Sequence, residues 1–130
     1  MNYNKYHSQK CRCLQGHLHD SKREASRCNE LTILERAGEI TDLRQQVKYI
    51  LIPTQYKYTG ERYTKGSKKG ELKASGVLEK ECAYIADFDY IDKKTGEHII
   101  EDTKGMKTKD YIIKRKLMLY IHQIRISEVE

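Results

Sequence analysis

Three residues in two neighbouring segments are of the chemical types that bind a divalent cation and hydrolyse a phosphodiester. Asp87 lies in segment 84–90, and Asp102 and Lys104 lie in segment 99–105. Both segments read as strands, in which alternate side chains share a face, so Asp102 and Lys104 are expected on one face. Asp87 can lie beside them if the two strands pair as a hairpin. Carboxylates that hold Mg²⁺ beside a lysine indicate metal-assisted phosphodiester hydrolysis.

Each member of this group has an expected role. Asp87 and Asp102 are the candidate metal ligands, and the backbone carbonyl of Thr103 is a further one. Lys104 would orient the attacking water or stabilise charge that develops on the phosphate. The alternative is a solvated hairpin whose charged side chains face water. The apolar pair 99–100 weighs against that alternative, because it suggests a strand with a buried end.

Two further acids flank the candidate site. By strand parity Asp89 could share a face with Asp87, whereas Glu101 should point opposite Asp102. Glu101 is therefore expected outside the metal site.

A second group of residues near the N-terminus could bind zinc, which accepts two thiolates and two imidazoles in a tetrahedron. Its C-x-C and H-x-H spacings are tighter than those of most zinc motifs, so a polar segment with incidental Cys and His is the alternative. Cys28 and Cys82 are expected to pack as small apolar residues. The candidate zinc ligands are Cys11, Cys13, His17 and His19.

Length and charge limit the class of protein. The chain has 130 residues, of which 34% are charged and 38% hydrophobic, which is typical of one globular domain. Its net charge of +6 favours an acidic partner, most commonly nucleic acid. No apolar run reaches the ~20 residues of a membrane span and no secretory signal is visible, so we expect no membrane partner and a cytoplasmic location.

The candidate site must be positioned by a small set of elements. Residues 1–19 lack periodicity and are expected to form an N-terminal arm carrying the Cys/His segment, before a single domain over 20–130. A helix is predicted over 21–37, because Ser21 and Glu24 fit a capping box and Gly38 supplies a stop. Its apolar stripe consists of Ala25, Cys28, Leu31 and Leu34.

The rest of the chain predicts strands and a second helix. Strands are expected at 47–52 and 123–129, and residues 92–96 form a hairpin-type turn between the two acidic strands. The polar segment 54–80 contains turn signals, three tyrosines that could lie on a hairpin, and a lysine cluster. That cluster could approach a phosphate backbone or lie in a solvated flexible loop. A helix over 108–121 should bury Ile113, Leu117, Tyr120 and Ile121.

This order of elements predicts an α/β (α+β) sandwich with a mixed central sheet flanked by helices. The spacing of Ala86-Asp87, fourteen further residues, and Asp102-Thr103-Lys104 then resembles the PD-(D/E)xK nuclease signature, with Ala86 in place of the proline. The chain also resembles a family of small phage-encoded endonucleases of this superfamily, which are similar to Holliday-junction resolvases. The matching segments are 20–25, 43–49, 84–88, 101–108 and the final helix, so the resemblance covers residues 16–129.

The resemblance implies a restriction-endonuclease-like αβββαβ core and one more site residue. Glu24 matches an acid on the first helix that completes the metal site of such nucleases, although it could instead act only in the capping box. Gln46 matches a position that lies near the site in similar nucleases.

Together these features predict a Mg²⁺-dependent DNA endonuclease, with Mn²⁺ as a substitute, acting on branched or duplex DNA in phage DNA recombination or processing. Nothing resembles a recognition helix, so cleavage selective for DNA structure is favoured. A homodimer follows by analogy with junction resolvases. The alternatives are a non-catalytic nucleic-acid-binding module on a nuclease fold and a zinc-stabilised interaction protein. The candidate phosphate contacts are Lys107, Lys109, Lys114 and Arg115.

Overall fold

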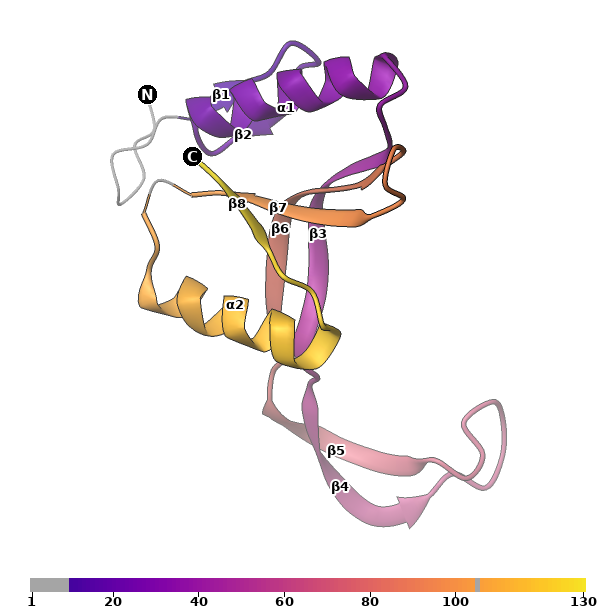
Figure 1. Ribbon diagram of the computed structural model, residues 1–130. Helices are drawn as coiled ribbons and strands as arrows, with labels where there is room; N and C mark the ends of the chain where they lie inside the picture. The colour runs from indigo at the N-terminus through magenta and orange to yellow at the C-terminus, as the bar shows by residue number, and fades with distance from the viewer. Residues whose placement is uncertain (1–9, 105) are drawn as a thin grey trace.

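The computed structural model describes residues 10–104 and 106–130, in which two helices pack against a four-stranded sheet (Figure 1). The elements in chain order are β1 (Cys11–Arg12), β2 (Leu18–His19), α1 (Lys22–Arg36), β3 (Ile40–Ile52), β4 (Gln55–Arg62), β5 (Leu72–Glu79), β6 (Cys82–Asp92), β7 (His98–Thr103), α2 (Lys109–His122) and β8 (Ser127–Val129). The predicted α+β class with a mixed sheet and two helices is confirmed. None of the helices in the described parts of the chain is long and apolar enough to cross a membrane.

The four-stranded sheet has the order β3-β6-β7-β8. Strand β6 pairs antiparallel with both β3 and β7, whereas β7 and β8 are parallel. The pairing of β6 with β7 stops at Phe88 and Glu101, and from there β7 continues alongside β8. Asp87 and Asp102 are the next residues on their strands. The two acids therefore lie where the two strands part.

Helix α1 forms as the sequence predicts. Ser21 is its N-cap and accepts a hydrogen bond from the Glu24 amide at 3.1 Å. Gly38 adopts a left-handed conformation (φ 79°) just past the end, which a residue without a Cβ does at little cost. The inner face buries Ala25, Cys28 and Leu31 against Phe88 and Tyr90 of β6.

Helix α2 begins after the N-cap Thr108, but its buried face differs from the predicted one. The side chains of Ile113 and Tyr120 are 57% and 83% exposed, and Tyr111 and Met118 are buried instead. Leu117 is partly buried at the edge of this face. The prediction was wrong because residues 111–113 and 117–121 are all apolar, so several helical stripes are equally hydrophobic.

The sheet and helices enclose two clusters of buried side chains. The first lies between α1 and one end of β6 and includes Phe88 and Tyr90. The second packs α2 against Tyr84, Ala86 and Ile100. Figure 1 shows α1 and α2 on opposite sides of β7 and β8. The acids at the parting of β6 and β7 lie between these two clusters.

Segment 54–80 forms a hairpin, so it is not a flexible loop over its whole length. Strands β4 and β5 pair antiparallel with several register shifts, and most of their side chains are exposed. The hairpin extends away from the rest of the molecule beyond the ends of β3 and β6 (Figure 1).

Two other predicted boundaries are corrected. Residues 10–19, expected to be an arm, form the β1–β2 hairpin, and Cys13 is buried with α1 in the first cluster. The predicted strand 123–129 is ordered as a strand only at its end. Gln123 takes a left-handed conformation that caps α2, and the following residues bring Ile126 into the second cluster.

Candidate functional site

Three carboxylates from three separate elements meet at the parting of β6 and β7. Glu24 comes from the first turn of α1, Asp87 from β6 and Asp102 from β7. The Asp87 carboxyl group lies next to both Glu24 and Asp102, so it is the central member. Its Oδ2 also accepts the backbone N–H of Thr103 at 2.8 Å. The structure thus brings together the three acids that the sequence predicts.

Two of the three residues of this acidic cluster are shielded from water, and Asp87 is half-buried. Glu24 is 5% exposed and Asp102 is 2% exposed. Burial, and then the neighbouring Glu24, raise the pKa of Asp87 to about 7. Burial, and then the charge of Asp87, raise the pKa of Asp102 to about 7. Asp87 and Asp102 therefore resist simultaneous ionisation unless positive charge is added.

Lys104 supplies part of that charge. Its Nζ lies 3.1 Å from Asp102 Oδ1 and 4.5 Å from the centre of the Tyr111 ring. The side chain is 27% exposed, so it reaches from the acidic cluster toward solvent. Asp102 and Lys104 share a side of β7 as predicted.

Two buried oxygens at the acidic cluster lack a hydrogen-bond partner among the described residues. Tyr84 donates its hydroxyl to Asp102 Oδ2 at 2.5 Å. Asp102 Oδ1 has only the ion pair with Lys104 and no hydrogen bond of good geometry within the described ranges, and the buried Thr103 Oγ1 also lacks a partner there. Buried oxygens of this kind normally have partners. A group of crowded carboxylates in which one oxygen atom lacks a hydrogen-bond partner suits a hard divalent cation.

Glu24 combines the two roles between which the sequence leaves a choice. Its Oε2 accepts the backbone N–H of Asp20 at 2.9 Å, so the carboxylate does turn back toward the start of the helix. It also lies against Asp87. The two roles are compatible because the N-terminus of α1 points at the site.

The two flanking acids have partners of their own. Glu101 accepts hydrogen bonds from Arg27 and Tyr90 on the α1 side, so its expected exclusion from the cluster is confirmed. Asp89 binds Tyr49, Arg44 and His98. Burial by itself would raise the pKa of Asp89, but these hydrogen bonds outweigh it and hold the pKa below its usual value.

Gln46 lies on β3 between the pairs Gln45–Phe88 and Val47–Ala86, at the register position that faces Asp87. Its φ is 52°, a conformation that residues with a side chain rarely adopt and that often marks functional positions. The role of the Thr103 carbonyl stays a prediction.

The four expected phosphate contacts are of two kinds. Lys107 and Arg115 both pair with Glu128, at 2.7 Å each, and this draws the pKa of Glu128 down to about 2. Lys109 is exposed and Lys114 half-buried, and neither forms an ion pair with the part of the chain that the structure describes. Lys109 and Lys114 are thus the more available of the four.

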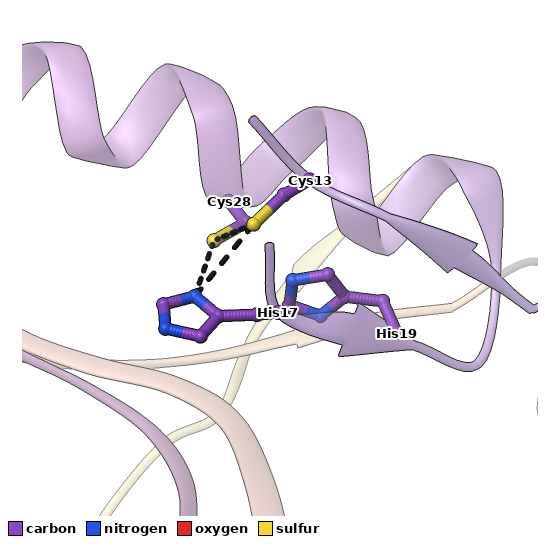
Figure 2. A group of neighbouring side chains, drawn as sticks. All are labelled: Cys13, His17, His19 and Cys28. Carbon is purple, nitrogen blue, oxygen red and sulfur yellow. Dashed lines mark hydrogen bonds between the residues drawn. The ribbon is translucent and has the colours of Figure 1, made fainter. Parts of the chain in front are cut away.

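The N-terminal Cys/His segment forms a second group that could hold a metal, with a different membership from the predicted one. The side chains of Cys13, His17, His19 and Cys28 converge within 4.8 Å of one another (Figure 2). Cys11 is not a member and packs beside the first cluster, so that assignment was wrong. Cys28 packs in the first cluster as expected, and it is also a member of this Cys/His group. It lies one turn after Glu24 on the buried face of α1, and only the packing of the β1–β2 hairpin reveals its neighbours.

The two thiols of this Cys/His cluster differ in acidity. Burial would raise the pKa of Cys13, but hydrogen bonds from the Gln15 backbone and from Cys28 outweigh it and lower the pKa. Burial, and then the adjacent Cys13, raise the pKa of Cys28 to about 11. Cys13 is therefore the thiol that ionises first.

Comparison with known proteins places the chain in one family. A family model described as "Protein of unknown function (DUF1064)" matches residues 3–128, which is nearly the whole chain, and the protein belongs to this family. No curated protein and no solved structure matches the chain.

Proposed function

We propose that this protein is a metal-dependent endonuclease that hydrolyses phosphodiester bonds of DNA, with a restriction-endonuclease-like core of the PD-(D/E)xK kind. The observation that carries the proposal is the acidic cluster of Glu24, Asp87 and Asp102 with Lys104 beside it. Four residues from three segments of the sequence meet at one place, and their types are those that metal-assisted phosphodiester hydrolysis needs.

The arrangement of the elements supports the same proposal. Leaving aside the two small hairpins, the chain order is α1, β3, β6, β7, α2 and β8. This is the αβββαβ order that the resemblance implies.

The acidic cluster fits Mg²⁺, with Mn²⁺ as a substitute, because its donors are carboxylate oxygens and one of them is incompletely bonded. Glu24, Asp87 and Asp102 would hold the ion. When bound, such an ion lowers the pKa of a water molecule and neutralises charge on the phosphate.

The residues of the chain prepare this site in defined ways. Tyr84 fixes the Asp102 carboxylate through its hydroxyl, and the Thr103 amide fixes Asp87. Lys104, held over the Tyr111 ring, presents its ammonium group at the solvent-facing edge. There it can stabilise negative charge on the phosphate or orient the attacking water.

Basic side chains supply a surface for the DNA backbone. Lys109 and Lys114 lie on α2, close in sequence to Lys104. The β4–β5 hairpin carries six basic and three acidic residues between Gln55 and Glu79, and Lys68 and Lys73 lie over the ring of Tyr63. Contacts of this kind give affinity without sequence readout, which favours selectivity for DNA structure. Cutting both strands of a branched substrate would require two sites and hence a homodimer.

The test is cleavage of a synthetic four-way junction and a matched linear duplex, with Mg²⁺, with Mn²⁺ and with neither. The proposal predicts metal-dependent cleavage that Asp102→Ala abolishes while DNA binding persists. A preference for the junction would support the structure-selective form. Binding of both DNAs without cleavage under every metal condition would overturn the proposal in favour of a non-catalytic nucleic-acid-binding module.

A further inference from the structure

We infer that Cys13, His17, His19 and Cys28 form a closed, tetrahedral zinc site that fastens the β1–β2 hairpin to helix α1. This site is separate from the acidic cluster and does not depend on the proposed nuclease activity.

The three distances among Cys13, His17 and Cys28 match those between the ligands of a tetrahedral zinc ion. The two sulfur atoms are 3.6 Å apart, and His17 Nδ1 lies 3.6 Å from Cys13 Sγ and 3.9 Å from Cys28 Sγ (Figure 2). Zinc bonds of ~2.3 Å to sulfur and ~2.0–2.1 Å to nitrogen at a tetrahedral angle place two sulfurs ~3.8 Å apart and a sulfur and a nitrogen ~3.6 Å apart. These three separations therefore require only small adjustments, and the ligand atom of His19 lies within 4.8 Å of the other three. A disulfide is excluded because its sulfur atoms would be ~2.05 Å apart.

A buried ring nitrogen without a hydrogen-bond partner provides independent support for a bound metal ion. His19 is 3% exposed, and its Nε2 has no hydrogen-bond partner within residues 10–104 and 106–130. Imidazole nitrogens in a protein interior normally have a partner. The other ring nitrogen, Nδ1, faces Glu24 Oε2 at 3.8 Å. A histidine that binds metal through one nitrogen commonly directs the other toward a carboxylate, so the orientation of His19 is that of a zinc ligand.

The backbone holds the hairpin ligands in place without a metal. The Cys13 amide donates to the His17 carbonyl at 3.0 Å, and the Gly16 amide donates to the Cys13 carbonyl at 2.9 Å. The Leu14 amide donates to the side chain of Asn29 on α1 at 2.9 Å, which ties this turn to the helix. Binding would require one rearrangement, since the Gln45 side-chain amide contacts His17 Nδ1 at 3.0 Å and must withdraw.

The ligand set indicates a structural and not a catalytic zinc. Four protein side chains fill the tetrahedron and leave no position open for water or substrate. Cys13, His19 and Cys28 are all buried, and only His17 is exposed. Residues 10–19 contain short strands with few apolar side chains, so a metal supplies stability that this segment cannot obtain from a core of its own.

The zinc site shares helix α1 with the acidic cluster. Cys28 lies one turn after Glu24, and His19 immediately precedes Asp20, whose amide binds Glu24 Oε2. A zinc ion bound by His19 and Cys28, which lie on either side of Glu24 in the sequence, would fix the position of the Glu24 carboxylate. The inferred zinc thus positions a residue of the candidate active site without touching the reacting atoms.

The test is zinc analysis of the full chain purified without chelator, together with the absorption spectrum after Co²⁺ replacement. We expect one zinc per chain and the intense visible bands of tetrahedral cobalt with thiolate charge transfer. Cys28→Ser should weaken zinc binding by at least ~100-fold, since even losing a residue that supports a ligand costs 10- to 100-fold. Cys11→Ser and Cys82→Ser are the matched controls and should leave stoichiometry and spectrum unchanged.

A second measurement covers the case in which Cys28→Ser does not fold. A strong chelator added to the unaltered protein should release one zinc and lower the melting temperature, and added zinc should restore it. The inference is overturned if the unaltered protein binds no zinc and gives no tetrahedral cobalt spectrum, or if Cys11→Ser loses metal as completely as Cys28→Ser. None of these readouts requires DNA cleavage.

Discussion

Replacing Asp87 by Asn should stabilise the protein at neutral and alkaline pH in the absence of magnesium. Asp87 is the central member of the acidic cluster, and its pKa is raised from 3.8 to about 7. The folded chain therefore keeps a proton over a pH range in which the unfolded chain has lost it. The unfolding free energy must then decrease as the pH rises from about 4 to about 7. Asparagine removes the charge and can still accept the Thr103 amide.

The size of the effect follows from the shift. Three pKa units correspond to about 4 kcal/mol at about 1.4 kcal/mol per unit, which is an upper limit. Asp87 is partly exposed and shares its proton with Asp102, so screening and coupling reduce the expected gain to about 1–3 kcal/mol at pH 8. The gain should shrink as the pH falls below 7 and vanish near pH 4, where both states are protonated.

The assay is urea denaturation at several pH values between 4 and 8 in magnesium-free buffer, with zinc retained. Asp89→Asn is the matched control, because Asp89 lies two residues away on the same strand but has a lowered pKa and partners in Tyr49, Arg44 and His98. Its substitution should destabilise the protein at pH 8. Added Mg²⁺ should stabilise the unaltered protein and not Asp87→Asn. If Asp87→Asn is less stable than the unaltered protein at pH 8 without magnesium, the reasoning about the crowded carboxylates is refuted.

Two further predictions concern Glu101 and the β4–β5 hairpin. Glu101→Gln should cost about 2 kcal/mol of unfolding free energy, because it leaves Arg27 and Tyr90 without their buried carboxylate. Glu30→Gln is the control and should cost less than about 0.5 kcal/mol, because it removes only the exposed partner of the same Arg27. Chemical denaturation measures both, and equal losses would contradict the assignment of Glu101 as a structural residue. Replacing Lys68 and Lys69 together by Ala should weaken DNA binding and reduce the slope of log K against log salt by about 2, since each phosphate contact contributes about 0.9. Fluorescence anisotropy over a salt series measures this, with Lys93→Ala/Lys94→Ala in the β6–β7 turn as the control, and an unchanged slope would exclude the hairpin from the DNA surface.

Local signals in the sequence were sufficient for α1 and for two of the three acids of the acidic cluster. The capping residues Ser21 and Gly38 mark the ends of the helix, and its apolar stripe is unambiguous. Asp87, Asp102 and Lys104 were predicted together because strand parity and a short hairpin turn limit where they can lie.

Glu24 came from the resemblance and not from any local pattern, because its local role as a capping residue is equally well satisfied.

Other features depend on tertiary packing that the sequence does not encode locally. Cys28 joins the Cys/His cluster because the β1–β2 hairpin folds onto α1, which no spacing rule indicates. The packing of the second cluster decides which face of α2 is buried, because several faces of this helix are hydrophobic enough to be buried. Strand β8 is short although polar and apolar residues alternate from position 123 onward as in a strand. Gln123 adopts a left-handed conformation and Ile126 is buried in the core, so the strand begins only after them.

The most direct test of the central claim is cleavage of a labelled four-way DNA junction with Mg²⁺ by the unaltered protein, Lys104→Met and Lys94→Met. Lys104 contacts Asp102 at the acidic cluster, whereas Lys94 is an exposed lysine in the turn between β6 and β7. We expect cleavage by the unaltered protein and by Lys94→Met, and a loss of at least ~100-fold in Lys104→Met with DNA binding retained. Cleavage by Lys104→Met at the rate of the unaltered protein, or no cleavage by any of the three, would contradict it.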